Sequence, residues 1–288
     1  MPTFKDQAIC IRHWDWSETS QTVSLFTAEH GLIRGLAKGS KRENAPFSGG
    51  IELLTRGEVV LILKAGAREQ GTLSTLTAWD LQEPFTPLRR SLPHLHAAMF
   101  VVDLVHHALH DLDPHTRLFV ALNRSLEHLA AGAPPMRMIL AFLWALLEET
   151  GYRPELFRDP RSGVPIPAGH VHVFSPRLGG LLAGGGGSPG ISGIAPATGS
   201  AAITTGRTDG GAALEDHEVW KVRSDTVGVL RVLAGADESL DLDGFVVDTR
   251  VPDEAVQRAA ALLASYFRFI HRTWPASIRW VLPDHLMR

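Results

Sequence analysis

The fold of the first part of this chain is decided by one stretch near its N-terminus, Val23-Ser24-Leu25-Phe26-Thr27-Ala28-Glu29-His30-Gly31-Leu32-Ile33-Arg34-Gly35-Leu36-Ala37. Two short apolar runs, 23–27 and 31–37, flank the polar Glu29-His30, and a glycine follows at once. Short apolar runs on both sides of a polar, glycine-containing break are typical of two β-strands joined by a tight turn.

Three further runs of the same kind lie on either side of this hairpin, at 8–11, 58–63 and 71–77. Five short strands separated by glycine-containing turns predict a small closed or partly open β-barrel. An SH3-like barrel fits the same pattern nearly as well. We expect the barrel to enclose residues from the apolar phase of its strands or from fully apolar runs, namely Ile9, Ile11, Leu25, Val60 and Ile62.

From about residue 88 the pattern changes to apolar residues spaced three and four apart, which predicts helices. Asp113-Pro114 marks a helix start, and Gly151 marks a helix end. A run dense in glycine and proline, 152–213, interrupts this pattern, and its Gly184–Gly190 segment predicts a flexible loop. The predicted helices are 95–112, 114–129, 138–147, 217–233 and 254–272.

Composition bounds the possibilities further. The chain has 288 residues, 44% of them hydrophobic, which excludes wholesale disorder and favours two or three domains. Its one cysteine, Cys10, excludes an internal disulfide framework and a cysteine-rich zinc site. No apolar run is long enough to span a membrane, and no signal peptide is recognisable, so we expect a cytoplasmic protein with no membrane partner. The formal net charge of −3 gives no overall reason to expect nucleic acid.

Local charge does give such a reason. Arg34, Lys38, Lys41 and Arg42 lie within nine residues, with no acid in that window. Four cations on a strand and the loop after it can follow a phosphate backbone. Three aromatic residues are candidates for stacking on bases: Trp14, Trp16 and Phe47. The alternative is a solvated loop beside ordinary core aromatics.

Other chemistry finds little support. His106 and His110 have the i,i+4 spacing of a helical metal site, but no glutamate separates them as in H-E-x-x-H and no third ligand is suggested. Phosphate-binding and nucleophile motifs are absent, and no carboxylate pair stands out as a general acid and base. We therefore expect that the protein is not an enzyme.

Several segments together resemble one known family. The N-terminal phrase F-T-x-E-H-G-L-x-x-x-x-A-K-G-x-x-R spans Phe26–Arg42, and Gly151-Tyr152-Arg153-Pro154-Glu155-Leu156 follows the third predicted helix. With Gly71-Thr72-Leu73 and the closing segment Tyr266–Trp280, these motifs resemble the bacterial recombination mediator family RecO. The resemblance is strongest over residues 5–42 and weakest from Leu156 to about Val251.

This resemblance implies an α+β fold with an N-terminal OB-fold β-barrel, an α-helical domain and a small degenerate zinc-ribbon-like insertion. The expected divisions are 1–82 for the DNA-binding OB-fold, 83–156 for the helical domain, 157–213 for the degenerate zinc module with its glycine-rich loop, and 214–288 for C-terminal helices that pack on the helical domain.

The resemblance also implies a function in DNA repair. Members bind single- and double-stranded DNA, anneal complementary strands, and work with RecR to load recombinase onto strands coated by SSB. They are not enzymes, and they act in the cytoplasm at the nucleoid. The alternative is a protein-interaction adaptor for RecR-like and SSB-like partners with little DNA binding of its own.

The resemblance assigns the basic cluster to DNA binding. Arg34, Lys38, Lys41 and Arg42 would neutralise phosphates, which predicts a salt-dependence slope of roughly −3 on single strands. Arg12 is expected to extend this track, and Arg89 and Arg90 are expected to carry it onto a second surface.

Many members also hold zinc with two cysteine pairs, and here this chain departs from the family. The corresponding positions are Asp159, Ser162, Ala183 and Gly186. We therefore expect no metal and no cofactor, the alternative being a site formed by His170, His172 and Asp159. Packing would then have to replace the metal, and the candidates are Val164, Ile166, Val171, Val173 and Leu178.

Overall fold

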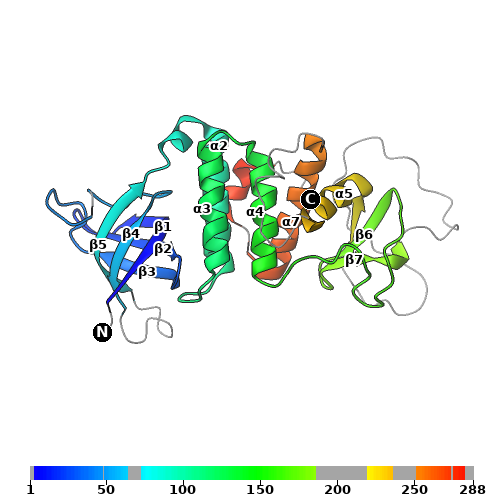
Figure 1. Ribbon diagram of the computed structural model, residues 1–288, viewed down its shortest axis with the longest axis horizontal. Coiled ribbons are helices and arrows are strands. Elements are labelled where there is room, and N and C mark those ends of the chain that lie inside the picture. Colours follow the sequence, from blue (N-terminus) through cyan, green and yellow to red (C-terminus); the bar gives the residue numbers. More distant parts are fainter. Residues whose placement is uncertain are drawn as a thin grey trace. The chain divides into compact units, whose positions relative to one another are not determined.

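A computed structural model of the chain describes residues 3–47, 49–63, 73–185, 219–235, 251–273 and 275–282. The chain forms two compact units, Met1–Met138 and Ile139–Arg288 (Figure 1). The domain boundaries expected at residues 82, 156 and 213 stay a prediction.

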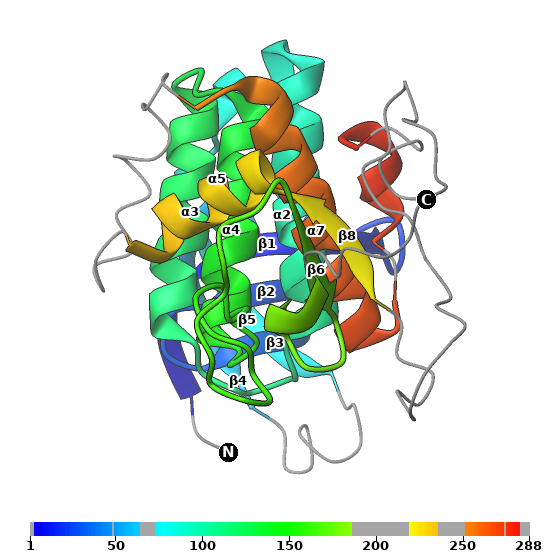
Figure 2. The ribbon, with the colours of Figure 1, turned by 90° about the vertical axis from the view of Figure 1, so that its right-hand side faces the viewer.

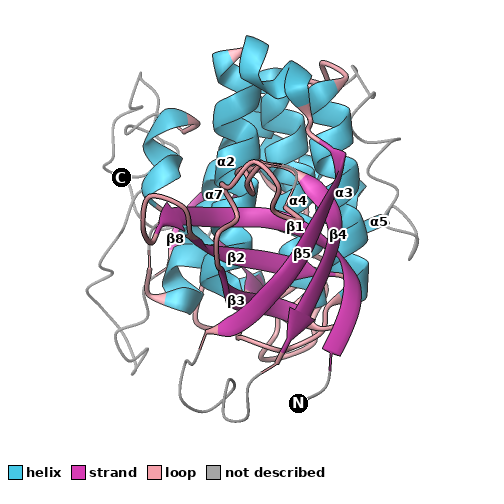
Figure 3. Cartoon of the chain, turned by 90° about the vertical axis from the view of Figure 1, so that its left-hand side faces the viewer, coloured by secondary structure: helices cyan, strands magenta, loops and turns pink. Residues whose placement is uncertain are grey.

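The first unit begins with a closed five-stranded barrel (Figure 3). Around the barrel the strands follow the order β1-β2-β3-β5-β4, with β3 and β5 parallel and the other pairs antiparallel. This arrangement confirms the predicted OB-fold and excludes the SH3-like alternative. The strand bounds are β1 Thr3–Asp15, β2 Gln21–Thr27, β3 Gly31–Ala37, β4 Arg56–Ile62 and β5 Ser74–Glu83.

The barrel interior differs from the predicted one. Of the five residues expected inside, only Leu25 belongs to the core cluster. On β4 the phase was wrong, because Val59 and Leu61 face inward while Val60 and Ile62 lie on the other side of the strand and are half-buried. Residues 59–63 are all apolar, so alternation within this run could not show which face points inward. The interior is formed by Ala8, Cys10, Val23, Leu25, Ile33, Ala37, Phe47, Ile51, Val59, Leu61, Leu76 and Trp79.

Ile9 and Ile11 are fully buried, but outside the barrel interior. A register shift between Cys10 and Arg12 leaves Ile11 as the extra residue of a bulge. Ile9 pairs with Phe26 of β2, whose ring meets that of Phe119 edge-on at a centroid distance of 5.8 Å. The helices of the first unit therefore cover this part of the outer face of the barrel.

Those helices follow a short 3-10 turn, Thr86–Arg90, and are α2 Leu92–Ala108 and α3 Thr116–Ala130. α2 ends four residues earlier than predicted, and Leu109 is already extended. The cause is tertiary, because the N–H of Leu112 donates to the carbonyl of Leu32 at 2.9 Å and draws the chain onto β3. The next helix, α4 Pro135–Glu149, agrees with its prediction and ends before Gly151, which has a positive φ of 81°.

The second unit contains a three-stranded sheet of order β7-β6-β8 with the helices α5 and α7 (Figure 2). The helix predicted over 217–233 is wrong at its start, since Trp220–Arg223 form the strand β8, which pairs with β6. The sequence did contain a signal for this strand, since apolar and charged residues alternate with period two in Trp220-Lys221-Val222-Arg223. The bounds are β6 Val171–Ser175, β7 Gly180–Leu182, α5 Ser224–Gly235, α7 Asp253–His271 and the 3-10 turns Ala183–Gly185 and Ala276–Trp280.

Candidate nucleic-acid interface

The outer face of β1, β2 and β3 is built of rows of paired residues. Arg12 pairs with Ser24, which pairs with Arg34, and Trp14 pairs with Thr22, which pairs with Leu36. Paired residues lie on the same face of a sheet, and so do residues two apart along a strand. The register therefore gathers side chains that are far apart in the sequence onto one surface.

The rows differ in polarity and in exposure to solvent along the strands. The row of Ile9, Phe26 and Leu32 is apolar and buried under the helices. The next row, with Arg12 and Arg34, is ionic, and the row of Trp14, Thr22 and Leu36 is open to solvent in part. Trp14 is 50% exposed, so its side chain keeps contact with solvent.

The two arginines of the ionic row form ion pairs with carboxylates of the same chain. Arg12 donates a hydrogen bond to Asp103 of α2, which also lies 3.6 Å from Nε2 of His107. Nε of Arg34 lies 3.3 Å from Oδ1 of Asp111, in the connection that follows α2. Both arginines are thus partnered, and their expected contact with DNA stays a prediction.

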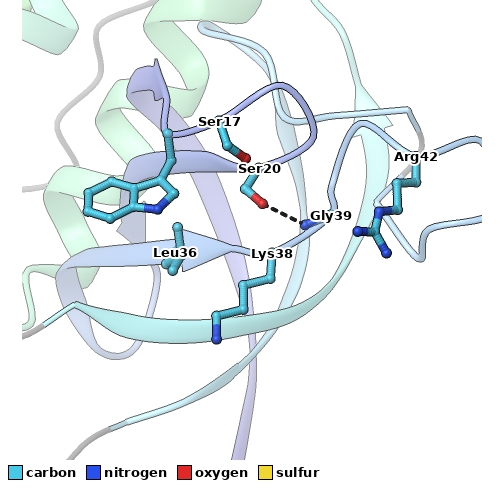
Figure 4. A pocket seen from close by; sticks show the side chains of 7 residues that line it. Ser17, Ser20, Leu36, Lys38, Gly39 and Arg42 are labelled. Carbon is cyan, nitrogen blue, oxygen red and sulfur yellow. Dashed lines mark hydrogen bonds between the residues drawn. The ribbon is translucent and has the colours of Figure 1, made fainter.

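Beyond the open row lies a shallow pocket of about 420 Å³. Trp16, Leu36, Lys38 and Arg42 contribute its large side chains. Figure 4 shows that Lys38 and Arg42 leave the chain on either side of Gly39 and extend in the same direction. Trp16 is 64% exposed, which suits a ring that stacks on a base.

The loop after β3 is held in place by the loop between β1 and β2. Oγ of Ser20 accepts the N–H of Gly39 at 3.0 Å, and the N–H of Lys41 donates to the carbonyl of Thr19 at 3.1 Å. Gly39 has a φ of +66°, and a Cβ there would lie 3.3 Å from Cδ of Arg42. Glycine at position 39 therefore permits the left-handed backbone turn and leaves room for the Arg42 side chain beside it.

The seven predicted cations do not form one continuous track. The side chains of Lys38 and Arg42 have no hydrogen-bond or ion-pair partner within the described ranges. Nζ of Lys41 lies 2.5 Å from Oδ1 of Asp15, and this hydrogen bond holds the pKa of Asp15 below its ordinary value. Of the seven, Lys38 and Arg42 alone line the pocket.

The two arginines predicted for a second surface lie in the turn Thr86–Arg90. Arg89 donates to Glu52 at 3.2 Å and to the carbonyls of Leu53 and Pro84, so it ties loops of the first unit together. Arg90 is exposed. Phe47, the third stacking candidate, is wrong, because it is only 2% exposed and belongs to the barrel core.

The helical metal hypothesis is also wrong in its geometry. α2 ends at Ala108, so His106 and His110 do not share a helix face. Burial, with Arg12 and His107 nearby, lowers the pKa of His106 to about 4. Throughout the part of the chain that the structure describes, no three His, Cys, Asp or Glu side chains gather into a set able to hold a metal, and this includes His170, His172 and Asp159.

At the expected zinc positions the structure has a carboxylate cross-link. Asp159 is 3% exposed, and its carboxylate accepts the backbone N–H of Ala183 at 2.9 Å and that of Arg161 at 2.8 Å. Burial opposes its ionisation, but these N–H groups and the Arg161 guanidinium outweigh burial and lower the pKa of Asp159 to about 2. Ser162 only accepts a weak bond from Val164, and Gly186 lies outside the described residues.

Aliphatic packing does not replace the metal as predicted. Val164, Val171 and Leu178 are exposed, while Ile166 is buried and Val173 half-buried. Aromatic contacts contribute instead, since Phe174 stacks on Trp220 and meets Tyr266 edge-on.

Replacing Asp159 with asparagine is expected to lower the free energy of unfolding of the second unit by about 2–3 kcal/mol, because hydrogen bonds to a charged acceptor are lost. The folded-state pKa of about 2 lies below the ordinary value of about 3.9. The ionised carboxylate therefore stabilises the folded state in full at any pH above about 3.9. This stabilisation is lost as the pH falls towards about 2. Thermal unfolding across the acid range measures both effects.

The matched control is Arg161→Ala, which removes the half-exposed ion pair but keeps the backbone N–H, and it should cost less than about 1 kcal/mol. A chelator should leave the melting temperature unchanged. Stoichiometric zinc in the purified protein, or equal effects of the two variants, would contradict the assignment.

Sequence reasoning missed the residues that position this interface. Ser20 and Gln21 fix the loop, with Oε1 of Gln21 accepting bonds from Ser40 and from the N–H of Ile51. Asp103 and Asp111 partner Arg12 and Arg34 across more than seventy residues of sequence, and no local pattern signals such pairs.

Comparison with known proteins gives consistent matches. The family described as recombination protein O N terminal matches residues 1–85, and recombination protein O C terminal matches residues 89–200. Among the helices described, none combines the length and apolar character needed to cross a membrane.

Similar proteins carry the name DNA repair protein RecO. That of Anaeromyxobacter sp. is 31% identical over 221 residues, which cover 76% of this chain and 84% of the relative. That of Geobacter metallireducens is 33% identical over 168 residues, covering 58% and 66%, and that of Rhodopirellula baltica 35% over 147 residues, covering 51% and 53%. The matches to the latter two thus span less than two thirds of the relatives' length.

Proposed function

Because this chain belongs to the RecO family, we propose that it acts in DNA repair and binds single-stranded DNA on the outer face of its barrel. The binding surface consists of Trp14, Trp16, Lys38 and Arg42, which we name the open platform. The name of the relatives supports a role in DNA repair, and the open platform supports single-stranded DNA as the ligand.

The observation that carries this proposal is that exposed indoles lie beside cations whose side chains have no partner among the residues described. Non-specific recognition of single strands combines aromatic rings, on which bases stack, with a positive groove that follows the backbone. OB-folds bind oligonucleotides on the face of strands 2 and 3 and on the adjoining loops. Leu36 lies in β3, Lys38 directly follows that strand, and Trp16 lies in the loop between β1 and β2.

The finer role follows from the family resemblance. The protein binds and anneals single- and double-stranded DNA, and with RecR and SSB as partners it helps load recombinase onto SSB-coated strands. It needs no cofactor, performs no catalysis, and works in the cytoplasm at the nucleoid. Lys41, Arg12, Arg34, Arg89 and Arg90 would add contacts only where their present partners yield or a longer strand reaches them.

The test is binding of a fluorescent oligothymidylate, followed by anisotropy at several salt concentrations. Trp16→Ala is expected to weaken binding about tenfold, because stacking of a base on an aromatic ring contributes about 1–3 kcal/mol. Trp280→Ala is the control, since this tryptophan of the second unit is also exposed.

Equal affinities of the Trp16→Ala and wild-type proteins would contradict the stacking role. If the wild-type protein bound no oligothymidylate even at low salt, the proposal would fail and the adaptor alternative would be favoured.

A further inference from the structure

A carboxylate of the chain lies beside one of the arginines next to the open platform. Nε of Arg34 is 3.3 Å from Oδ1 of Asp111. The Arg34 side chain is 49% exposed, and no other ion pair to it is found within the described residues. The terminal nitrogens of its guanidinium are therefore available to a ligand, while the charge of Asp111 neutralises it.

Asp111 is held there by the backbone and not by its own side chain. Leu32 and Asp111 form a parallel bridge, and the N–H of Leu112 donates to the carbonyl of Leu32. Gly31, with a φ of +73°, lets this segment approach, since a Cβ at that position would lie 2.1 Å from the carbonyl oxygen of Asp113. The connection after α2 thus fixes the carboxylate against β3.

The pair has poor hydrogen-bonding geometry. Oδ1 of Asp111 is buried and accepts no hydrogen bond from the described residues. A buried carboxylate oxygen without a donor costs free energy, so this contact is a poor source of stability. The neighbouring pair differs, because there Arg12 donates a hydrogen bond to Asp103, which is a residue of α2.

We propose that Asp111 is an internal substitute for a phosphate group: it occupies Arg34 and so limits the affinity of the barrel for single-stranded DNA. The proposal rests on the proposed function of the open platform. Ser24 and Arg34 follow Thr22 and Leu36 along the same face, so a strand that continues beyond the platform reaches Arg34. Its phosphate then competes with Asp111 for the guanidinium.

The experiment compares Asp111→Asn with the wild-type protein in the oligothymidylate assay. Freeing one cation for one more phosphate should steepen the salt slope by about 0.7 and raise affinity roughly five- to tenfold at about 50 mM salt. The gain must depend on Arg34, so Arg34→Gln should cost more affinity in the Asp111→Asn background than in the wild type.

Glu58→Gln is the matched control. Glu58 lies 2.7 Å from Nζ of Lys5, so this variant also frees a cation, but on the β1–β4 side of the barrel. Its affinity for oligothymidylate should equal that of the wild-type protein. Asp111→Ser provides a second neutral variant if the asparagine variant unfolds. If the wild-type protein binds but neither neutral variant binds more tightly, the inference about Asp111 is overturned. If the wild-type protein does not bind at all, the proposed function fails instead.

Discussion

Replacing Val59 with aspartate is expected to abolish folding of the barrel, whereas the same replacement at Val60 leaves the protein folded. Val59 is fully buried in the barrel core, so the new carboxylate would have neither water nor a partner. Burying an unpaired charge costs several kcal/mol, which is comparable with a net stability of about 5–15 kcal/mol. Val60 is half-buried on the opposite side of β4, where a carboxylate keeps contact with water.

Circular dichroism with thermal unfolding tests this pair of variants. Val60→Asp should unfold cooperatively, at a cost of about 1 kcal/mol, and Val59→Asp should be insoluble or lack the transition of the first unit. A cooperatively folding Val59→Asp protein together with an unfolded Val60→Asp protein would reverse the assigned phase of β4.

The double variant Lys38→Ala/Arg42→Ala is expected to bind oligothymidylate roughly 50-fold more weakly at about 50 mM salt. Each phosphate neutralised on a single strand contributes about 0.7 to the slope of log affinity against log salt, so two lost cations flatten it by about 1.4. Neither side chain has a partner within the described ranges, and the melting temperature should therefore stay unchanged.

Lys5→Ala is the control, because it removes an exposed cation elsewhere on the barrel. Similar slopes for the double variant and the wild type would show that the two cations do not contact the strand.

The wild-type slope also separates the two interpretations of the basic cluster. Four free cations predict a slope of roughly −3 and an affinity loss of about 50-fold between about 50 and 200 mM salt. Two free cations predict about −1.4 and a loss of about sevenfold over the same range. The ion pairs of Arg34 and Lys41 favour the second value.

The sequence by itself determined much of this protein. Alternation and turn residues located all five barrel strands, and the spacing of apolar residues located all five expected helices, although one of them begins later than predicted. The phrase Phe26–Arg42 indicated the family, because it is a long and ordered motif along one hairpin and its loop. Such signals are local, since they express the period of a single strand, helix or turn.

Only the tertiary structure decided which way strands and side chains face. The phase of β4, the exclusion of Ile9 from the barrel interior and the early end of α2 all depend on neighbours distant in the sequence. The same holds for the interface, where the side chains of Lys38 and Arg42 meet no ion-pair partner among the described residues, whereas Arg34 meets Asp111. A charge is free or neutralised according to what the fold places beside it, and that placement results from long-range pairing and burial, which no period in the sequence encodes.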